Sequence, residues 1–182
     1  METVTIHDRK FRLSITPETI SATVSEIAKK LNDNLKGKNV LLVPVLNGAF
    51  MFASDLIKKL YIPCQISFVK LSSYSGMSSL GVIDSIIGLT DDAKNKTVVI
   101  LEDIIDSGRT LQSLISEIRK KKPAEIIVVT LLFKPGAFIN KFKIDYIGFR
   151  IPDDFVIGYG LDYDGLGRNL NGVYTAIENS VT

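Results

Sequence analysis

The chain has 182 residues, 46% of them hydrophobic, so we expect one well-cored domain over residues 1–182, and no linker-like stretch or shift in composition divides it. A net charge of +2 leaves no broad basic face for nucleic acid, and one cysteine and one histidine leave too little material for an internal disulfide or a zinc cluster. No apolar run has the length of a membrane span or the flanks of a signal peptide, so we expect a cytoplasmic protein without a membrane partner.

The first predicted element is an amphipathic helix that begins after a polar arm. Thr16 and Pro17 supply a capping hydroxyl and a first-turn proline. The apolar residues that follow have helical spacing and end near Gly37. They are Ile20, Val24, Ile27, Ala28 and Leu31.

Strands and helices then alternate along the chain. Residues 40–46 have the pattern of a buried strand, and a glycine corner and a helix over residues 50–60 follow it. Further strands are predicted at residues 66–71, 97–101, 126–133 and 146–149. This alternation predicts an α/β fold, a parallel central sheet flanked by helices with right-handed crossovers. Residues 72–90 are too long and too polar for an ordinary connection, which favours a lid or a disordered loop.

The stretch from residue 97 to residue 110 is the most informative. Its first part, residues 97–101, is apolar and mostly β-branched, as in a strand buried on both faces, and two acids, Glu102 and Asp103, follow it. Ligands dock at the carboxyl ends of such strands. Apolar residues with helical spacing predict a helix that begins near Gly108, and its free amides and dipole attract a phosphate.

Three other motifs built from glycines and acids are excluded by the residues themselves. The G-x-x-x-x-G-K-[ST] pattern of a P-loop is absent. Gly158 and Gly160 lack the third glycine of a dinucleotide fingerprint. Residues 162–165 hint at a calcium loop, but the glycine comes two positions too early and the terminal glutamate is missing.

Two segments resemble a known family. Residues 98–110 resemble the 5-phosphoribosyl 1-pyrophosphate (PRPP) signature of the type I phosphoribosyltransferases: an apolar run, two acids, two apolar residues, Asp, Ser or Thr, Gly, any residue and Thr. Residues 151–163 resemble the purine-binding stretch of the hypoxanthine-guanine branch, and Arg168 follows as it does there. The resemblance runs from about residue 40 to residue 168, and weakly through the N-terminal arm.

This resemblance implies a fold and an activity. The fold would be a core of about residues 17–150 under a small hood, built from about residues 1–15 and 151–182, that covers the base. The activity would be a Mg²⁺-dependent step of purine salvage, in which the 5-phosphoribosyl group of PRPP passes to N9 of hypoxanthine, and also of guanine, with release of pyrophosphate. Members of the family commonly form homodimers or homotetramers.

The resemblance also assigns roles to the residues that would bind PRPP. Glu102 and Asp103 would hold the ribose hydroxyls and, together with Asp162, the metal ion. Asp106 would face N7 of the purine as a general base or a hydrogen-bond partner. The alternatives are an acidic strand end that meets solvent and, for Asp106, a helix cap. Hydroxyls and amides of four residues would wrap the 5-phosphate: Ser107, Gly108, Arg109 and Thr110.

A second group of residues would bind the purine. Lys134 would donate to the 6-oxo group, Phe155 would stack on the base, and the backbone of Val156 would meet its edge. Such a lysine would explain a preference for 6-oxopurines, because the amino group of adenine would leave the ammonium without an acceptor. The alternatives are an exposed lysine and core packing of the two apolar residues.

A third group would bind pyrophosphate. Asn47 and Gly48 align with a loop that, in relatives, contains a non-proline cis peptide whose amide contacts pyrophosphate. Relatives often carry Lys or Arg in place of Asn47, so a side-chain charge is missing in this chain. Arg168 resembles the pyrophosphate-binding arginine, and a surface ion pair with Asp162 is the alternative.

Ser73 and Tyr74 match the dipeptide of the mobile loop of the family, whose closure would keep water from the reacting centre. The sequence is also compatible with two other functions. One is a relative that prefers xanthine or another base, and the other is a PRPP-sensing regulator that binds nucleic acid or a protein. The regulator predicts an added DNA-binding domain or a basic face, and the chain shows neither clearly.

Overall fold

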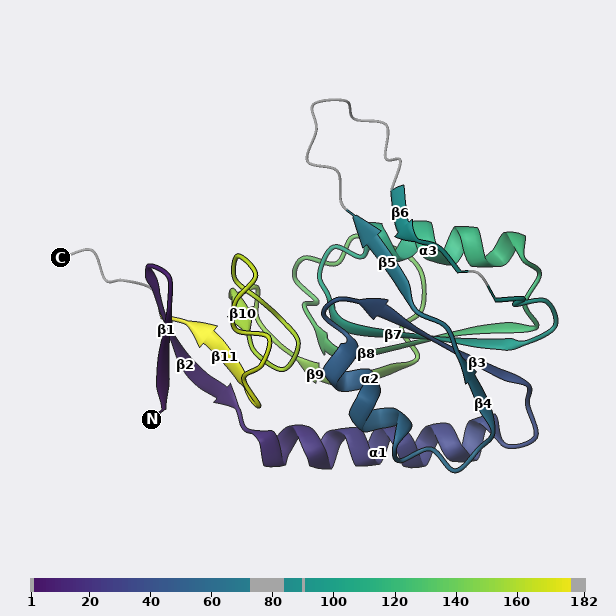
Figure 1. The fold of residues 1–182 in the computed structure, drawn as a ribbon, viewed down its shortest axis with the longest axis horizontal. Helices are drawn as coiled ribbons and strands as arrows, with labels where there is room; N and C mark the ends of the chain where they lie inside the picture. The colour runs from purple at the N-terminus through teal and green to yellow at the C-terminus, as the bar shows by residue number, and fades with distance from the viewer. Residues whose placement is uncertain (1, 73–83, 90, 178–182) are drawn as a thin grey trace.

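The computed structural model describes residues 2–72, 84–89 and 91–177 and contains two sheets of unequal size (Figure 1). Ser73 and Tyr74 fall outside these ranges. The larger sheet consists of β3 (Val40–Leu46), β4 (Cys64–Ile66), β5 (Val69–Ser72), β6 (Asp84–Ile87), β7 (Thr97–Ile105), β8 (Glu125–Phe133) and β9 (Tyr146–Arg150). The described helices are α1 (Pro17–Leu35), α2 (Phe50–Ile57) and α3 (Arg109–Lys120).

The larger sheet is parallel except at one edge. Its strands follow the order β6-β5-β3-β7-β8-β9, with β4 also paired to β3, and β6 runs antiparallel to β5. Leu42 of β3 lies beside Val99 of β7, which lies beside Ile127 of β8. Because parallel strands end at the same edge of a sheet, the segments that follow β3, β7 and β8 meet there. The predicted α/β fold with a parallel central sheet is confirmed.

Alternate residues of the central strands face opposite layers of helices. Leu42 and Val99 pack in one cluster with α1 and α2, whereas Leu41 and Val98 pack in another with α3. In Figure 1, α1 and α2 lie below the sheet and α3 lies above it. The central strands are therefore buried on both faces, which explains their unbroken apolar runs.

Helix α1 begins and ends where the sequence predicts. Oγ1 of Thr16 accepts a hydrogen bond from the amide of Thr19 (3.3 Å), and Pro17 opens the first turn. Gly37 follows the helix with a φ of +76°, a left-handed conformation that glycine adopts without steric cost. Among the described residues, no helix combines the length and the apolar character needed to cross a bilayer.

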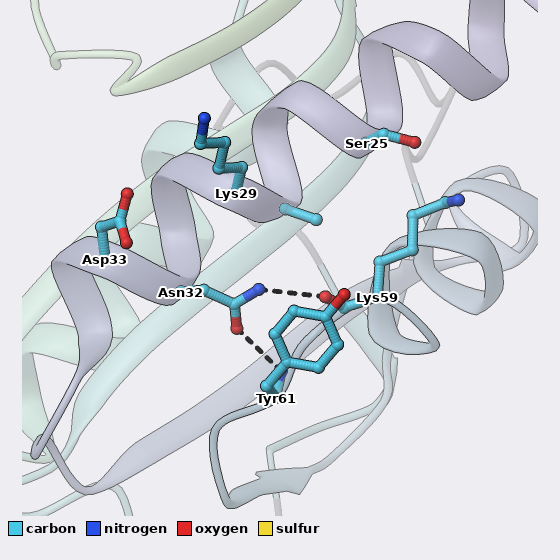
Figure 2. A pocket seen from close by; sticks show the side chains of 7 residues that line it. Ser25, Lys29, Asn32, Asp33, Lys59 and Tyr61 are labelled. Atoms are coloured by element: carbon cyan, nitrogen blue, oxygen red, sulfur yellow. Dashed lines mark hydrogen bonds between the residues drawn. The ribbon is translucent and has the colours of Figure 1, made fainter.

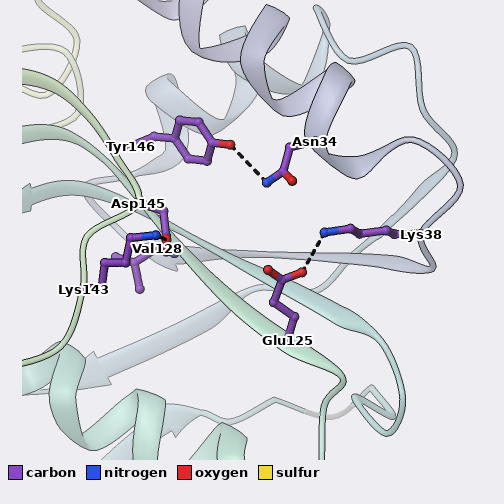
Figure 3. Close-up of polar contacts among 7 residues, drawn as sticks. All are labelled: Asn34, Lys38, Glu125, Val128, Lys143, Asp145 and Tyr146. Carbon is purple, nitrogen blue, oxygen red and sulfur yellow. Dashed lines mark hydrogen bonds and ion pairs between the residues drawn. The ribbon is translucent and has the colours of Figure 1, made fainter.

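Polar side chains fix the start of the edge strand β9 (Figure 3). Asp145 exchanges two hydrogen bonds of 2.9 Å with Val128: its amide donates to the carbonyl, and its Oδ2 accepts from the amide. Lys143 Nζ lies 2.8 Å from Asp145 Oδ1. Asn34 of α1 donates to the hydroxyl of Tyr146 (3.1 Å). These contacts set the register of β9 and tie it to α1.

The two ends of the described chain build the smaller sheet, which we call the hood. It is antiparallel, with the order β1 (Thr3–Ile6), β2 (Arg9–Ile15), β11 (Val173–Ala176) and β10 (Val156–Ile157). Phe11, Ile157 and Tyr174 form its buried centre. The prediction that the N-terminal arm and the C-terminal segment join in a hood is confirmed.

Strand β7 is longer than predicted. It continues to Ile105, because Ile104 and Ile105 pair with Leu132 and Phe133 at the end of the equally long β8. The predicted strand end at residue 101 was therefore wrong. Glu102 and Asp103, which we expected just beyond the strand, lie within the second half of β7. As neighbours in a strand, they face opposite sides of the sheet.

Two other boundaries also differ from the prediction. The single strand predicted at residues 66–71 is divided into β4 and β5, which both pair with β3. The break lies opposite Pro44 of β3, which has no amide hydrogen to donate to a neighbouring strand. Within residues 72–90, expected to be a lid or a disordered loop, β6 pairs with β5, while residues 73–83 and 90 lie outside the described part of the chain.

Replacing Leu31 with alanine should destabilise this fold. Leu31 is 0% exposed within the cluster between α1, α2 and the sheet, so the truncation removes apolar contacts and leaves a cavity, at a cost of about 2–5 kcal/mol. Urea unfolding measures the change, with the exposed Lys30→Ala on the same helix as the control. Equal losses for the two variants would contradict the packing described.

Candidate active site

The loop after β3 contains an unusual peptide bond. The bond between Leu46 and Asn47 is cis, as the resemblance implies for this loop. Gly48 follows, and α2 begins two residues later. Asn47 accepts a backbone hydrogen bond from Phe50 (3.3 Å), so the loop leads directly into the helix.

Three segments that are distant in the sequence meet at Gly48. A Cβ added to Gly48 would overlap the carboxylate of Asp103 on β7. A Cβ added to Gly160 of the hood, whose φ is +103°, would overlap the carbonyl oxygen of Gly48. Only glycine fits at these two positions, and the contact joins the β3 loop, the end of β7 and the hood.

Glu102 and Asp103 form a coupled acidic pair. Burial and the neighbouring Asp103 carboxylate raise the pKa of Glu102 well above its ordinary value. Burial also raises the pKa of Asp103, although the amide of Ile104, which donates to its Oδ1 (2.9 Å), and the charge of Arg168 act in the opposite direction. Only 8% of Glu102 is exposed, so this is not an acidic strand end that simply meets solvent.

The turn after β7 encloses a small pocket of about 130 Å³. Glu102 lines this pocket together with the whole turn, residues 106–110. Gly108 is the N-terminal cap residue of α3 and has a φ of +76°. No side chain caps this helix, so the alternative that Asp106 is a helix cap is wrong. Within the described residues, the amides of Ser107, Gly108 and Thr110 donate to no protein acceptor and are free to bind an anion.

Lys134 follows β8 directly and is nearly buried. Only 8% of it is exposed, which excludes the alternative of an exposed loop lysine. Its amide donates to the carbonyl of Ile105 (2.9 Å), so it lies beside the end of β7. In the described part of the chain, its ammonium makes no hydrogen bond and no ion pair. An unpartnered ammonium on a nearly buried residue favours an acceptor supplied by a ligand.

An aromatic cluster in the hood surrounds Phe155. Its ring lies 5.6 Å from that of Tyr163 and 6.2 Å from that of Phe11, and the guanidinium of Arg9 lies over it at 5.7 Å. Phe155 is 41% exposed, so it is not simply a core residue, whereas the side chain of Val156 is buried in the core as the alternative held. Arg9 has no signal in the local sequence for this role, because β2 and β10 meet only through β11 in the hood sheet.

Arg168 is held in place by other residues of the hood. It forms an ion pair with Asp162 (2.6 Å) and donates a second hydrogen bond to the carbonyl of Gly160 (2.7 Å). The other carboxylate oxygen of Asp162 accepts from the amide of Gly165 (2.8 Å). The ion pair that was the alternative for Arg168 therefore exists, and it holds the guanidinium close enough for its charge to act on Asp103.

One residue that fastens the hood to the core was not found in the sequence. The hydroxyl of Tyr159 donates to Oδ2 of Asp55 on α2 (2.7 Å), across 104 positions of the chain. Tyr159 is 4% exposed, and its amide donates to the carbonyl of Leu170 (2.7 Å). No local pattern relates two positions so far apart.

A second hollow lies between α1 and the segment after α2 (Figure 2). Asn32 of α1 bridges the two: its Nδ2 donates to the carbonyl of Lys59 (3.0 Å), and its Oδ1 accepts from the amide of Tyr61 (2.8 Å). The amide group of Asn32 is therefore already engaged. This hollow contains none of the residues predicted to bind substrate.

The structure brings most of the predicted site residues together. Glu102 shares a pocket with the turn at residues 106–110, and Asp103 links that pocket to Gly48 and Arg168. Phe155 lies near this group only through its neighbours in the chain. Asp153, two positions before Phe155, lies against Gly136, two positions after Lys134. The three predicted metal ligands do not form a ready-made cluster, since the described residues contain no group of three or more His, Cys, Asp or Glu suited to a metal ion.

Comparisons with known proteins agree with this geometry. The family model described as the phosphoribosyl transferase domain matches residues 15–164. The hypoxanthine-guanine phosphoribosyltransferase of Mycobacterium avium is 40% identical over 168 residues, which cover 88% of this chain and 83% of the relative. A solved hypoxanthine phosphoribosyltransferase from Staphylococcus aureus is 38% identical with a TM-score of 0.87, covering 91% of both chains. A hypoxanthine-guanine phosphoribosyltransferase from Bacillus anthracis is 32% identical with a TM-score of 0.85, covering 91% of this chain and 96% of that one.

Replacing Tyr159 with phenylalanine should loosen the hood loop. The variant loses the bond to Asp55, worth about 0.5–1.5 kcal/mol, and residues 158–170 should exchange their amide hydrogens faster. Tyr174→Phe is the matched control, because its hydroxyl bonds to Glu2 within the hood (2.6 Å). Faster exchange of the same residues in Tyr174→Phe would contradict the assignment.

The contribution of the Tyr159–Asp55 hydrogen bond to stability should also depend on pH. Partial burial alone would raise the pKa of Asp55, but the hydrogen bonds from Lys58 and Tyr159 outweigh it and hold the pKa below 3.8. A lowered pKa means that the stabilisation is present above pH 3.8 and is lost as the pH falls through the lowered value. The difference in the free energy of unfolding between the wild type and Tyr159→Phe should therefore shrink as the pH falls below the lowered pKa of Asp55.

Proposed function

We propose, since this chain belongs to the phosphoribosyltransferase family, that it transfers the 5-phosphoribosyl group of PRPP to N9 of hypoxanthine and of guanine, with release of pyrophosphate. The relatives named for this activity support the proposal. The observation that carries it is Lys134, a nearly buried lysine whose ammonium has no protein acceptor among the described residues, at the edge where the turn at residues 106–110 and the acidic pair meet. A 6-oxopurine would supply the missing acceptor.

The donor would bind through backbone amides and carboxylates. Ser107, Gly108, Arg109 and Thr110 line the pocket that would hold the 5-phosphate, with the dipole of α3 behind it. The ribose hydroxyls would donate to the carboxylates of Glu102 and Asp103. The sugar would then lie between the turn and the contact at Gly48.

Glu102 and Asp103 also fit a magnesium ion. A dication beside two carboxylates whose pKa values are raised by burial would favour their ionised forms. Magnesium sites often use one or two carboxylates and take their other ligands from substrate phosphates and water, which suits the absence, among the described residues, of three acids grouped to hold an ion. Asp162, whose two oxygens each accept one bond from the protein, would contribute to the ion directly or through water. When bound, the ion would offset the negative charge of the pyrophosphate.

The leaving group would be bound by Gly48 and Arg168. The backbone of the β3 loop would offer its amides, and Asn47 adds no charge. Arg168 is already oriented by Asp162 and Gly160, so its guanidinium would bind the anion with little loss of conformational freedom.

The base would lie between the turn and the hood. The ring of Phe155 would stack on the purine, the backbone of Val156 would meet its edge, and Lys134 would donate to O6. Asp106, which lies exposed at the start of the turn, would face N7 and accept its proton or hydrogen bond. N9 would attack C1 of the ribose while the bond to pyrophosphate breaks, and the bonding electrons would leave with the pyrophosphate.

A steady-state assay with PRPP, Mg²⁺ and each of four bases tests this function. Hypoxanthine and guanine should be converted to their 5′-monophosphates, and adenine should not, because its 6-amino group cannot accept from Lys134. Preferential use of xanthine would assign the chain to a different base. Binding of PRPP without turnover of any base would favour a PRPP-sensing regulator instead.

Replacing Asp106 with asparagine should lower turnover strongly. The change removes the proton acceptor but keeps the size of the side chain, so kcat should fall by about 10²–10⁴-fold while the affinity for PRPP stays close to that of the wild type. Asp91→Asn, at an exposed position before β7, is the control. Unchanged turnover in Asp106→Asn would remove this residue from the mechanism.

Replacing Lys134 with alanine should weaken the use of 6-oxopurines. Loss of one charge-assisted hydrogen bond, worth about 1.5–3 kcal/mol, predicts a fall in kcat/KM for the base of about 10–150-fold with little change in the KM for PRPP. The control is Lys141→Ala, an exposed lysine of the same loop. Equal losses for both substrates would point to a folding defect instead.

A further inference from the structure

The loop that follows Lys134 contacts the turn that would bind the 5′-phosphate. Nδ2 of Asn140 donates to the carbonyl of Ser107 (2.6 Å), and the amide of Ile139 approaches the same oxygen (3.4 Å). The ring of Phe138 packs against Gly108, where an added Cβ would lie 2.7 Å from its Cε2. Side chains far from the turn in sequence therefore fix its backbone.

Holding the carbonyl of Ser107 also sets the direction of an amide. The peptide bond between Ser107 and Gly108 is trans, so its C=O and N–H point in opposite directions from one rigid plane. When the carbonyl turns toward Asn140, the amide of Gly108 must turn away from it. The next peptide behaves in the same way: the carbonyl of Gly108 accepts from Gln112 (2.9 Å), so the amide of Arg109 points out of the helix.

These two carbonyls are fixed by different means. The bond from Gln112 belongs to α3 and forms with the helix. The carbonyl of Ser107 lies outside the helix, and in the described part of the chain Asn140 is the one side chain that donates to it. The hydroxyl of Ser107 offers only a long local contact to the amide of Arg109 (3.5 Å).

We propose that Asn140 is a positioning residue for the 5′-phosphate. It does not touch the substrate but holds the carbonyl of Ser107, so that the amide of Gly108 is aimed at the phosphate before the ligand arrives. This inference rests on the proposed function, because it takes the turn at residues 106–110 as the phosphate site. A phosphate bound by preorganised amides loses less free energy to reordering of the loop.

The same loop links the phosphate to the base. Lys134 begins this loop, which continues past Asn140 to β9, and Phe138 packs between Phe133 (5.3 Å) and Phe142 (5.2 Å) in edge-to-face contacts. A short, aromatic-anchored segment therefore carries both the cation that would bind O6 and the amide that orients the phosphate turn.

Two ligands that differ only in the phosphate test the proposal. Isothermal calorimetry of the full chain with inosine 5′-monophosphate and with inosine gives the share of affinity that the 5′-phosphate contributes. Asn140→Ala should raise the Kd of the monophosphate about 5- to 10-fold, the effect of one hydrogen bond, and leave that of inosine within about twofold of the wild type. The KM for hypoxanthine should stay unchanged.

Two further variants complete the test. Asn140→Asp keeps the size of the side chain but replaces the donor with a carboxylate that repels both the Ser107 carbonyl and the phosphate, so its effect on the monophosphate should exceed that of Asn140→Ala. Asn34→Ala, which removes the amide bond to the hydroxyl of Tyr146, should change neither ligand.

Equal weakening of both ligands in Asn140→Ala, or wild-type affinity of Asn140→Asp for the monophosphate, would overturn the positioning role. A wild-type protein that binds inosine and its monophosphate equally would overturn the phosphate site itself, and the role of Asn140 with it. The steady-state assay with PRPP and the four bases measures turnover independently of this calorimetry. Failure of this inference and failure of the proposed function are therefore distinguishable.

Discussion

The close approach of the β3 loop, the side chain of Asp103 and the hood at Gly48 is the constraint on which the site depends. A side chain at Gly48 would overlap the carboxylate of Asp103, and the backbone of Gly160 lies against the carbonyl of Gly48. This contact brings the β3 loop, the end of β7 and the hood to within van der Waals distance. A site assembled in this way can surround a substrate from the sheet and from the hood at once.

The charges of the site are balanced only in part by the protein. Glu102 and Asp103 are buried next to each other, which raises the free energy of their doubly ionised state, and Arg168 offsets this at Asp103 alone. On the other side, Lys134 is nearly buried as a residue, and its ammonium has no partner among the described residues. Both groups gain from a ligand that carries hydroxyls and a carbonyl group, so the cost of their burial favours the bound state.

In the proposed site, backbone amides bind most of the anionic groups, and other residues determine where those amides point. Asn140 and Phe138 hold the turn around Gly108, while the hydrogen bond between Tyr159 and Asp55 fastens the loop that presents Arg168. A peptide plane has a fixed geometry, so a contact on its carbonyl side is felt on its amide side. In the proposed site, residues that do not contact the substrate would thus influence its affinity.

The sequence by itself determined most of the elements and the position of the turn that we propose binds phosphate. Helix α1 follows from the cap at Thr16 and a single apolar stripe, and the parallel sheet follows from buried runs that alternate with helices, because these patterns are local. Tertiary structure alone decided the end of β7, which depends on pairing with β8, the burial of Lys134, and the contacts of Tyr159 and Asn140 with partners far along the chain. Burial and long-range hydrogen bonds depend on which surfaces meet in space, and no local periodicity encodes that.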